Sequence, residues 1–230
     1  MHISRKTGLM GSLTAIAAAG LLLAGCSSGG SNMNDNMNGS SMNNSQHMTS
    51  MSTQSTPMNE FGGPMYTGKP DLGLTAALLQ AGGGASNFSL VTALNSMLGK
   101  DTVNSEVKKL TQQYGAQRVQ AWVKGIDFAV ADTVKIATAK GVKLPPPANL
   151  SGKDLAVALV KAGTDKDGYF WAGLLFDHIL SHPIHEQVMA DTDSQYSKAY
   201  DGNYHQITNQ AFYDVAQALG HTNIKLSPYH

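Results

Sequence analysis

The chain has 230 residues, of which 42% are hydrophobic and 14% are charged, with 16 basic and 16 acidic side chains and one cysteine. This balance excludes a collagen-like or fully disordered chain, a disulfide-rich scaffold and a strongly basic nucleic-acid binder. Long-range attraction to DNA is therefore not expected, and we predict no nucleic-acid partner.

The first 25 residues have the layout of a secretory signal. Arg5 and Lys6 form a basic start, and an apolar run from Leu9 to Leu23 follows them. The run is short for a membrane-spanning helix and rich in Ala and Gly, which favours a cleaved signal over a retained transmembrane segment. We therefore predict that residues 1–25 are removed from the mature protein.

The segment Leu23-Ala24-Gly25-Cys26 ends this run with the single cysteine of the chain. It resembles the lipobox of bacterial lipoproteins, and the resemblance covers the signal alone. It implies that the Cys26 thiol carries diacylglycerol, so that the protein is exported and held in the cell envelope by acyl chains, with the lipid bilayer as its partner. Ser27 after the cysteine implies sorting to the outer membrane where the host has one.

Residues 26–70 lack the apolar periodicity of a folded element. Ser, Asn, Met and Gly dominate this segment, and few large aliphatic side chains recur in it. Such a chain cannot offset its ordering entropy by burial, so we predict a disordered tether between the lipidated N-terminus and the folded domain.

Methionine is enriched in this tether, which holds seven of the eleven methionines of the chain. His47 stands beside Met48 and Met51. Thioethers are soft ligands that suit Cu(I), and clustered Met and His in an exported segment resemble methionine-rich copper-binding tails. The alternative is a low-complexity linker whose methionines bind nothing, which the irregular spacing and the single histidine favour.

From residue 71 to residue 230, apolar side chains recur at helical spacing, and no segment shows sustained strand alternation. The clearest stripes run over residues 103–114, 119–137 and 207–219. Each stripe is followed by a glycine that can end a helix: Gly115, Gly141 and Gly220. We therefore predict an all-α domain, a helical bundle of about eight helices.

Two further features refine this helical prediction. Asp101 or Thr102 is expected to cap the helix over residues 103–114, and Ser151 to cap the helix that follows it. Residues 169–176 are apolar nearly all round, which predicts a buried central helix.

The domain also matches itself at an offset of 81 residues. Residues 77–82 match 158–163, and the register holds as far as Thr111 and Thr192. One residue of slip then pairs Tyr114 with Tyr196, and 142–144 with 224–226. This colinear matching predicts a tandem duplication of a four-helix unit, with repeat 1 at 71–144, a Pro-rich junction at 145–153 and repeat 2 at 154–230.

The strongest candidate metal site is a run of histidines in the second half. On an unbroken helix His178, His182 and His185 would share one face at spacings that suit a transition metal, with Glu186 beside them. Pro183 should interrupt that helix, so a corner between two helices is expected, and a corner can still bring ligands together. Copper, another transition metal or haem is the expected ligand. The alternative is that these histidines are solvated or satisfied within the core.

Any such site belongs to one half only. At the offset of 81 residues, the first half holds other residue types at the four positions: Met97, Asp101, Asn104 and Ser105. This difference fits a scaffold that gained a function in one copy, and it fits neutral divergence of a corner equally well.

The sequence lacks the common catalytic signatures. It contains no Gly-x-Ser-x-Gly elbow, no phosphate-binding loop, no His-Glu-x-x-His helix and no Glu-x-x-His pair of the kind that di-iron bundles use. We therefore favour a non-enzymatic lipoprotein that acts in the envelope by binding or by association with a protein partner. A metal or haem binder is the alternative, and an enzyme is the least favoured interpretation.

Overall fold

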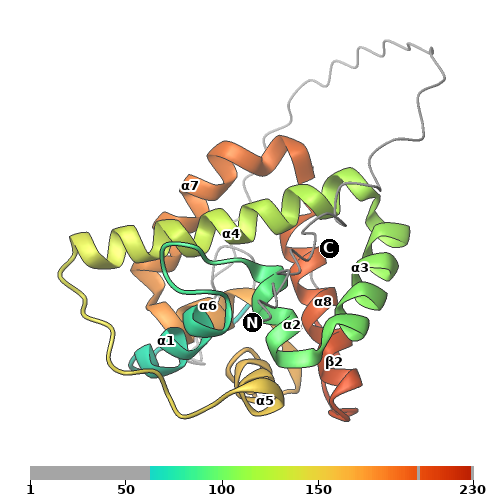
Figure 1. Ribbon diagram of the computed structural model, residues 1–230, viewed down its shortest axis with the longest axis horizontal. Coiled ribbons are helices and arrows are strands. Elements are labelled where there is room, and N and C mark those ends of the chain that lie inside the picture. The colour runs from blue at the N-terminus through green and yellow to red at the C-terminus, as the bar shows by residue number, and fades with distance from the viewer. Residues whose placement is uncertain (1–62, 201–202, 229–230) are drawn as a thin grey trace, which may run out of the picture. The chain divides into compact units, whose positions relative to one another are not determined.

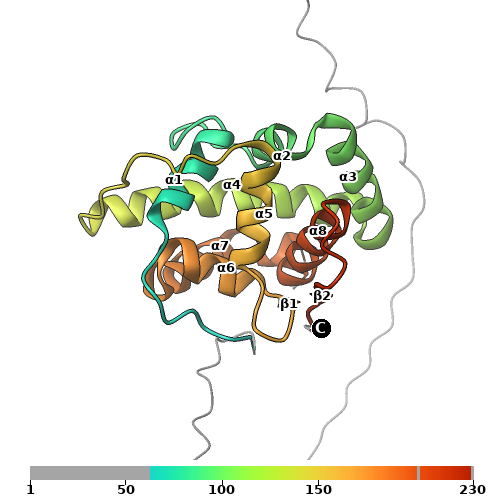
Figure 2. The same ribbon diagram turned by 90° about the horizontal axis from the view of Figure 1, so that it is seen from below.

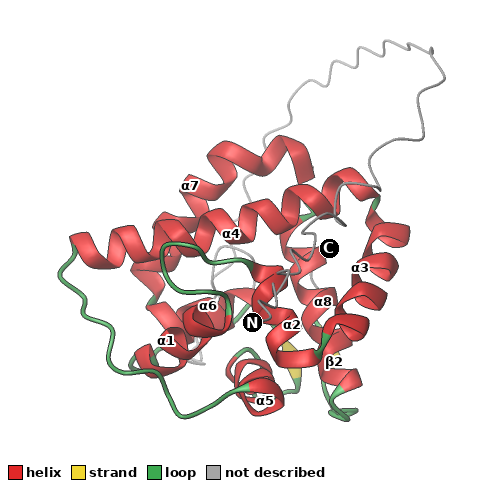
Figure 3. Cartoon of the chain, in the orientation of Figure 1, coloured by secondary structure: helices red, strands yellow, loops and turns green. Residues whose placement is uncertain are grey.

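The computed structural model of the chain describes residues 63–200 and 203–228 (Figure 1). The expectations for the signal peptide, for lipidated Cys26 and for the tether ligands His47, Met48 and Met51 lie outside these residues. Over the described ranges the chain forms eight helices and two strands of two residues each, so the prediction of an all-α domain is confirmed (Figure 3). None of these helices has the length and apolarity needed to cross a membrane.

The elements follow one another in the order that the periodicity predicts. The helices are α1 (Leu72–Ala81), α2 (Leu90–Leu98), α3 (Lys100–Tyr114), α4 (Ala116–Ala139), α5 (Gly152–Ala162), α6 (Ala172–Leu180), α7 (His182–Tyr200) and α8 (Tyr204–Ala218). The strands β1 (Tyr169–Phe170) and β2 (Lys225–Leu226) pair in parallel. The Pro-rich stretch between α4 and α5 contains neither helix nor strand.

Caps and glycines set the ends of the first helices. Asp71 caps α1, because its Oδ1 accepts a hydrogen bond at 2.9 Å from a backbone N–H of the first turn. α3 begins directly after Gly99, whose φ of 83° is one that glycine adopts readily. The expectation that Asp101 or Thr102 caps α3 is therefore wrong, since both lie in its first turn. Ser151 stands at the N-cap position of α5, but its side chain makes no capping hydrogen bond.

The buried helix expected over residues 169–176 is α6, which begins only at Ala172. Asp165 holds the residues before it in a turn, because its Oδ1 accepts from Tyr169 N at 2.9 Å and its Oδ2 from Trp171 Nε1 at 2.7 Å. Every side chain of α6 except that of His178 is then buried, which confirms the expectation of a central helix.

Both halves of the chain contribute to one apolar core. α4 and α7 lie side by side (Figures 1 and 2). Leu110, Leu159, Val188 and Ile207, which come from four different helices, are each at most 1% exposed. All described residues belong to one compact unit bounded by Ser52 and His230, so protein that starts at residue 27 retains the whole core.

The joint between α1 and α2 has the same hydrogen bond as the joint between α5 and α6. Ser89 N donates to Gly82 O at 2.9 Å, and Trp171 N donates to Gly163 O at 2.8 Å. Each glycine faces the aromatic ring of the residue just before the donor, which leaves no room for a Cβ. The two glycines are 81 residues apart and the two donors 82. The offset between the two halves therefore changes from 81 to 82 residues within this joint. The sequence matches had placed this change later, between Thr111 and Tyr114.

Candidate metal centre

A single residue, Ser181, separates α6 from α7. Its φ of 95° and ψ of 143° are rare for a residue with a Cβ, and among the described residues it is the only non-glycine with a positive φ. Ser181 N donates to Asp177 O at 3.0 Å, and His185 N donates to Ser181 O at 3.0 Å. Pro183 lies in the first turn of α7, where its missing N–H is tolerated. The helix break expected at Pro183 is therefore present, and it forms a sharp corner.

This corner brings Asp177, His182 and His185 together. His185 Nδ1 lies 2.7 Å from Asp177 Oδ1, and His182 Nδ1 lies 3.1 Å from the same oxygen. One ligand atom from each of the three side chains lies within 4.8 Å of the other two. Asp177 and His185 are each 1% exposed, whereas the His182 side chain is 28% exposed. The cluster is therefore buried on the side of Asp177 and His185 and open to solvent at His182.

The buried cluster can hold a metal ion. Imidazole nitrogens and carboxylate oxygens bind zinc at about 2.0–2.2 Å, which places tetrahedral ligand atoms about 3.3 Å apart. The contacts of Asp177 Oδ1 with His185 and His182 are 2.7 and 3.1 Å long. Asp177 Oδ1 needs to move only a few tenths of an ångström from each ring nitrogen to reach these separations, and each Nδ1 loses its proton to become a ligand.

The second nitrogens of the two rings have different surroundings. His185 Nε2 is buried and has no hydrogen-bond partner among the described residues, and its ring stacks on Phe176 with 5.5 Å between centroids. His182 Nε2 lies 3.4 Å from Glu186 Oε1. Glu186 is thus beside the cluster through His182 and is not one of the three convergent groups. A buried nitrogen without a partner is unusual in a folded protein and marks the position of His185 as one with a role to explain.

His178 lies outside the three-residue cluster. Its ring stacks on Tyr66 with 4.2 Å between centroids, and its backbone oxygen accepts from Asp71 N at 2.7 Å. Tyr66 N also donates to Asp177 Oδ2 at 3.4 Å. The last residues of the predicted tether therefore cross the corner, and the corner does not present the three histidines on one face.

Another histidine close to the cluster is held neutral. Burial, and secondarily the charge of His185, lowers the pKa of His205 from an ordinary value of 6.5 to about 3. Its ring packs edge-on against the ring of Tyr204, with 5.3 Å between centroids. A neutral His205 adds no positive charge that would oppose a cation at the corner.

The sequence pattern did not indicate Asp177 as a ligand. The available signal was its position as the only acidic residue in α6, an otherwise apolar helix. A carboxylate that is buried in such a helix must find partners, because an unpaired buried charge is strongly destabilising. His182 and His185 follow in the next helix and supply those partners.

The α2–α3 joint in the first half has the backbone geometry of this corner. Gly99 N donates to Asn95 O at 3.0 Å, as Ser181 N does to Asp177 O, and the spacing between the two joints is 82 residues. At that spacing the first half replaces the ligands with Asn95, Lys100 and Val103. The pairings expected at 81 residues, with Met97, Asp101, Asn104 and Ser105, are therefore one residue out of register with the hydrogen bonds.

The chain matches no protein-family model, no curated protein and no solved structure at a significant level. The function is therefore inferred from the chemistry of the corner and from the sequence of the N-terminal segment.

Proposed function

We propose that the protein is exported, anchored to the membrane through lipidated Cys26, and binds one transition-metal ion through Asp177, His182 and His185. The observation that carries the proposal is the convergence of two imidazole nitrogens and one carboxylate oxygen within 4.8 Å of one another. The proposed role is binding without catalysis in the cell envelope, at the outer membrane where the host has one. A protein partner there is proposed from the anchoring alone.

Zn(II) and Cu(II) fit this ligand set best. Imidazole suits zinc, copper, iron and nickel, and the hard carboxylate of Asp177 favours a divalent ion over Cu(I). Three protein ligands with one solvent-facing side leave a fourth position for water. Glu186 Oε1, 3.4 Å from His182 Nε2, can accept from the second nitrogen of that ring and orient it. Haem is disfavoured, because the ring of His185 is only 1% exposed and has no open surface to offer a macrocycle.

The tether supports a second copper proposal of a different kind. His47, Met48 and Met51 offer one imidazole and two thioethers, which suit Cu(I). The tether ends beside the corner, where Tyr66 N donates to Asp177 Oδ2 at 3.4 Å. An anaerobic Cu(I) titration in which Met48 and Met51 are replaced by leucine separates the two sites.

Calorimetric titration tests the metal proposal directly. Protein that starts at residue 27 is titrated at pH 7 with Zn(II) and, separately, with Cu(II). We expect one ion per chain with a Kd below about 1 μM, which corresponds to about 8 kcal/mol of binding free energy. The double variant His182→Ala, His185→Gln should bind at least about 100-fold more weakly, because two of three protein ligands are lost.

His178→Ala is the matched control, since it removes a histidine from the same corner but not from the cluster. It should bind both ions with the affinity of the unmodified protein, and circular dichroism should show that all variants keep their helices. Equal binding by the double variant, or no binding tighter than about 10 μM by the unmodified protein, overturns the proposal.

We further propose that the domain arose by tandem duplication of a four-helix unit. The matched hydrogen bonds of Ser89 with Gly82 and of Trp171 with Gly163 support this proposal. The matched helix corners, one at Gly99 and one at Ser181, support it independently. On this proposal the metal ligands were gained, or kept, by the second copy only.

A further inference from the structure

Residues 63–70, which precede α1, form a strap that crosses the end of α6; in Figure 2 it is the cyan trace that leads into α1. The ring of Tyr66 stacks on the ring of His178, with 4.2 Å between centroids and 26° between the ring planes. Gly63 is buried and Tyr66 is half-buried, so the strap lies against the helical domain.

The C-terminal end of α6 determines where the strap runs. The last four carbonyl groups of a helix have no partner within that helix. His178 O accepts a hydrogen bond from Asp71 N at 2.7 Å, and Ile179 O accepts one from the hydroxyl of Thr75. Asp71 is also the N-cap of α1, so the start of α1 is held on the last turn of α6. The residues before Asp71 therefore pass the side chains of that turn, Asp177 among them.

The strap donates a hydrogen bond to one of the proposed metal ligands. Tyr66 N donates to Asp177 Oδ2 at 3.4 Å, and among the described residues Oδ2 has no other hydrogen-bond donor. The other carboxylate oxygen, Oδ1, faces the rings of His185 and His182. The side chain of Asp177 is fully buried, so water does not take the place of the strap at Oδ2. One oxygen therefore faces the ligand rings while the other faces the strap.

We propose that the strap belongs to the metal centre. The Tyr66 N–H holds the Asp177 carboxylate in the orientation that binds a divalent ion, and the bound ion in turn holds the strap in place. Carboxylates that bind metals are themselves held by hydrogen bonds, and loss of such a partner typically costs about 10–100-fold in metal affinity. Such coupling is reciprocal, so the ion strengthens the docking of the strap by the same factor. This inference rests on the proposed metal site, in which Tyr66 is a positioning residue and not a ligand.

This coupling links the ion to the attachment of the domain. The strap joins the helical domain to the proposed tether and, through it, to the proposed lipid anchor at Cys26. An extended chain spans at most about 3.5 Å per residue, so release of residues 63–70 adds at most about 28 Å between anchor and domain. A bound divalent ion makes this release rarer and therefore keeps the domain closer to its anchor.

Two proline variants of the protein that starts at residue 27 test the hydrogen bond. Tyr66→Pro removes the N–H that Asp177 accepts, whereas Thr67→Pro places the same ring at the next, exposed position. In calorimetric titration with Zn(II) at pH 7, Tyr66→Pro should bind at least about tenfold more weakly than the unmodified protein. Thr67→Pro should bind within about threefold of the unmodified protein, and so should Tyr66→Ala, which loses the ring but keeps the N–H.

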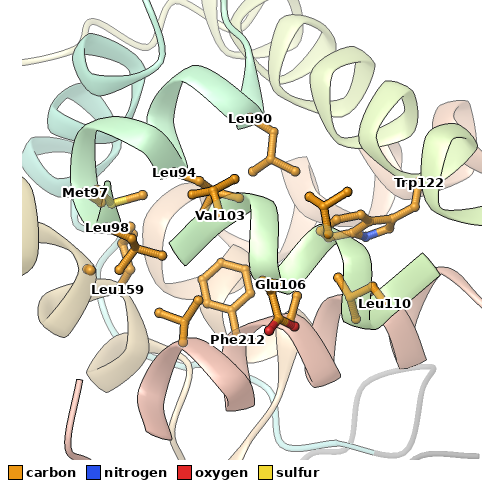
Figure 4. Close-up of a pocket in the computed structure, with 14 residues that line it drawn as sticks. Leu90, Leu94, Met97, Leu98, Val103, Glu106, Leu110, Trp122, Leu159 and Phe212 are labelled. Atoms are coloured by element: carbon orange, nitrogen blue, oxygen red, sulfur yellow. The ribbon is translucent and has the colours of Figure 1, made fainter. Parts of the chain in front are cut away.

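A core variant separates this effect from a general loss of stability. Leu94 lines two small apolar cavities of the core, with volumes of about 40 and 60 Å³; Figure 4 shows the smaller one. None of the residues that line these cavities belongs to the strap or to the metal cluster. Leu94→Ala enlarges the cavities and should lower the midpoint of urea denaturation, yet it should leave the affinity for Zn(II) unchanged.

Amide hydrogen exchange tests the reciprocal effect of the ion on the strap. In the unmodified protein, saturating Zn(II) should slow exchange at the amides of residues 65–69 about tenfold, because the strap is released more rarely. In Tyr66→Pro, saturating Zn(II) should leave the exchange of the remaining strap amides unchanged, since the hydrogen bond that couples them to Asp177 is absent. This measurement reads the strap itself and does not depend on how tightly a variant binds the ion.

Three outcomes overturn this inference and leave the proposed function standing. The first is Zn(II) binding by Tyr66→Pro that is as tight as binding by Thr67→Pro. The second is an equal loss of affinity in Leu94→Ala, which would assign the effect to stability. The third is strap exchange in the unmodified protein that Zn(II) does not change. No binding of Zn(II) by the unmodified protein instead overturns the proposed function, and this inference with it.

Discussion

The Asp177 carboxylate holds the corner together at the level of single residues. One of its oxygens accepts hydrogen bonds from His185 Nδ1 at 2.7 Å and from His182 Nδ1 at 3.1 Å, and the side chain is fully buried. The desolvation of this charge is offset because both rings point at one oxygen and the Tyr66 N–H points at the other. Without an ion, these three side chains therefore hydrogen-bond to one another. With an ion, the same side chains form the proposed ligand set.

Replacing this carboxylate by an amide should harm both stability and metal binding. In Asp177→Asn the negative charge is lost, and one terminal atom becomes a donor that faces a ring nitrogen. We expect the free energy of unfolding to fall by about 2–4 kcal/mol, measured by urea denaturation at pH 7. Zn(II) affinity should fall at least about 100-fold in the same protein.

The control for this prediction is Asp154→Asn, which changes an exposed aspartate in the first turn of α5. It should alter the free energy of unfolding by no more than about 0.5 kcal/mol. An Asp177→Asn protein that is as stable as this control would contradict a buried hydrogen-bonded role for the carboxylate.

Glu106 should make the protein less stable as the pH rises from about 5 to 8. Its pKa is raised from 4.5 to about 8, first by burial and then by Asp214. Between these two values the unfolded chain loses a proton that the folded chain keeps, so the free energy of unfolding falls with increasing pH. The loss should be on the order of 1–2 kcal/mol, because solvent partly screens this half-buried group.

Urea denaturation at several pH values measures this slope. Glu106→Gln removes the titrating group and should flatten the dependence of unfolding free energy on pH between 5 and 8. The same slope in the variant and in the unmodified protein would assign the pH dependence to another group.

His205 should have the opposite effect at acid pH. Burial, and then the charge of His185, lowers its pKa from 6.5 to about 3. Between these values the unfolded chain binds a proton that the folded chain does not, so stability is lost as the pH falls from 6.5 toward 3. For this buried ring the loss should reach on the order of 2–5 kcal/mol.

His205→Gln provides the comparison, since glutamine has polar atoms but does not titrate. Its free energy of unfolding should fall less steeply than that of the unmodified protein between pH 6.5 and 4. Parallel curves in this window would show that His205 does not control the acid sensitivity.

Among the elements, the junction of α6 and α7 stores strain. Ser181 adopts a φ of 95°, whereas the matching joint between α2 and α3 uses Gly99 with a φ of 83°. A side chain in this backbone region costs on the order of 1–3 kcal/mol. Ser181→Gly should therefore raise the free energy of unfolding by about 1 kcal/mol, measured by urea denaturation.

Gly99→Ser is the reciprocal variant. It should lower the free energy of unfolding by about 1 kcal/mol or more, because it introduces the same strain at the other joint. If Ser181→Gly were instead destabilising by this amount, the serine side chain would be making a contact that outweighs the strain.

The elements also show which features the sequence could predict. The apolar periodicity of residues 103–114 and the glycine after them predicted α3, because burial of one face and a glycine stop are local properties. The break at Pro183 was also predictable, because the effect of a proline on a helix is a local property. The start of α6 was not, because Asp165 holds Tyr169 and Trp171 in a turn through side-chain hydrogen bonds that periodicity does not record.

The candidate site was predictable only in part. The spacing of His182 and His185 and the helix break between them and α6 indicated a corner where ligands can meet. The role of Asp177 depends on how far the chain reverses at Ser181, which no local pattern in the sequence specifies. His178 lies outside the cluster and stacks on the ring of Tyr66, a contact between residues more than 100 positions apart that no local pattern indicates.

At the scale of the whole domain, two similar corners carry different side chains. Gly99 has a φ of 83° and a ψ of 150°, close to the 95° and 143° of Ser181. At the spacing of 82 residues, buried Val103 occupies the position of buried His185, and Asn95 occupies that of Asp177. Asn95 Oδ1 is buried and has no hydrogen-bond partner among the described residues. The backbone therefore forms two similar corners, at Gly99 and at Ser181. Only the corner at Ser181 has side chains that can form a metal-binding cluster.

Transferring the ligands to the first corner should create a second metal site. Asn95→Asp, Lys100→His and Val103→His together reproduce the second corner at the spacing of its hydrogen bonds. If the backbone determines where the ligands converge, calorimetric titration with Zn(II) should rise from one to two ions per chain. Circular dichroism checks that the triple variant keeps its helices.

The matched control follows the spacing of 81 residues that the sequence alone suggested. It carries three histidines at positions one residue away from the structural match: Met97→His, Asp101→His and Asn104→His. These rings are out of register with the corner, so the control should still bind one ion. A folded triple variant that binds one ion, or a control that binds two, would mean that the corner backbone does not set the positions of the ligands. Two ions in the triple variant alone would support both the metal centre and the descent of the two halves from one unit.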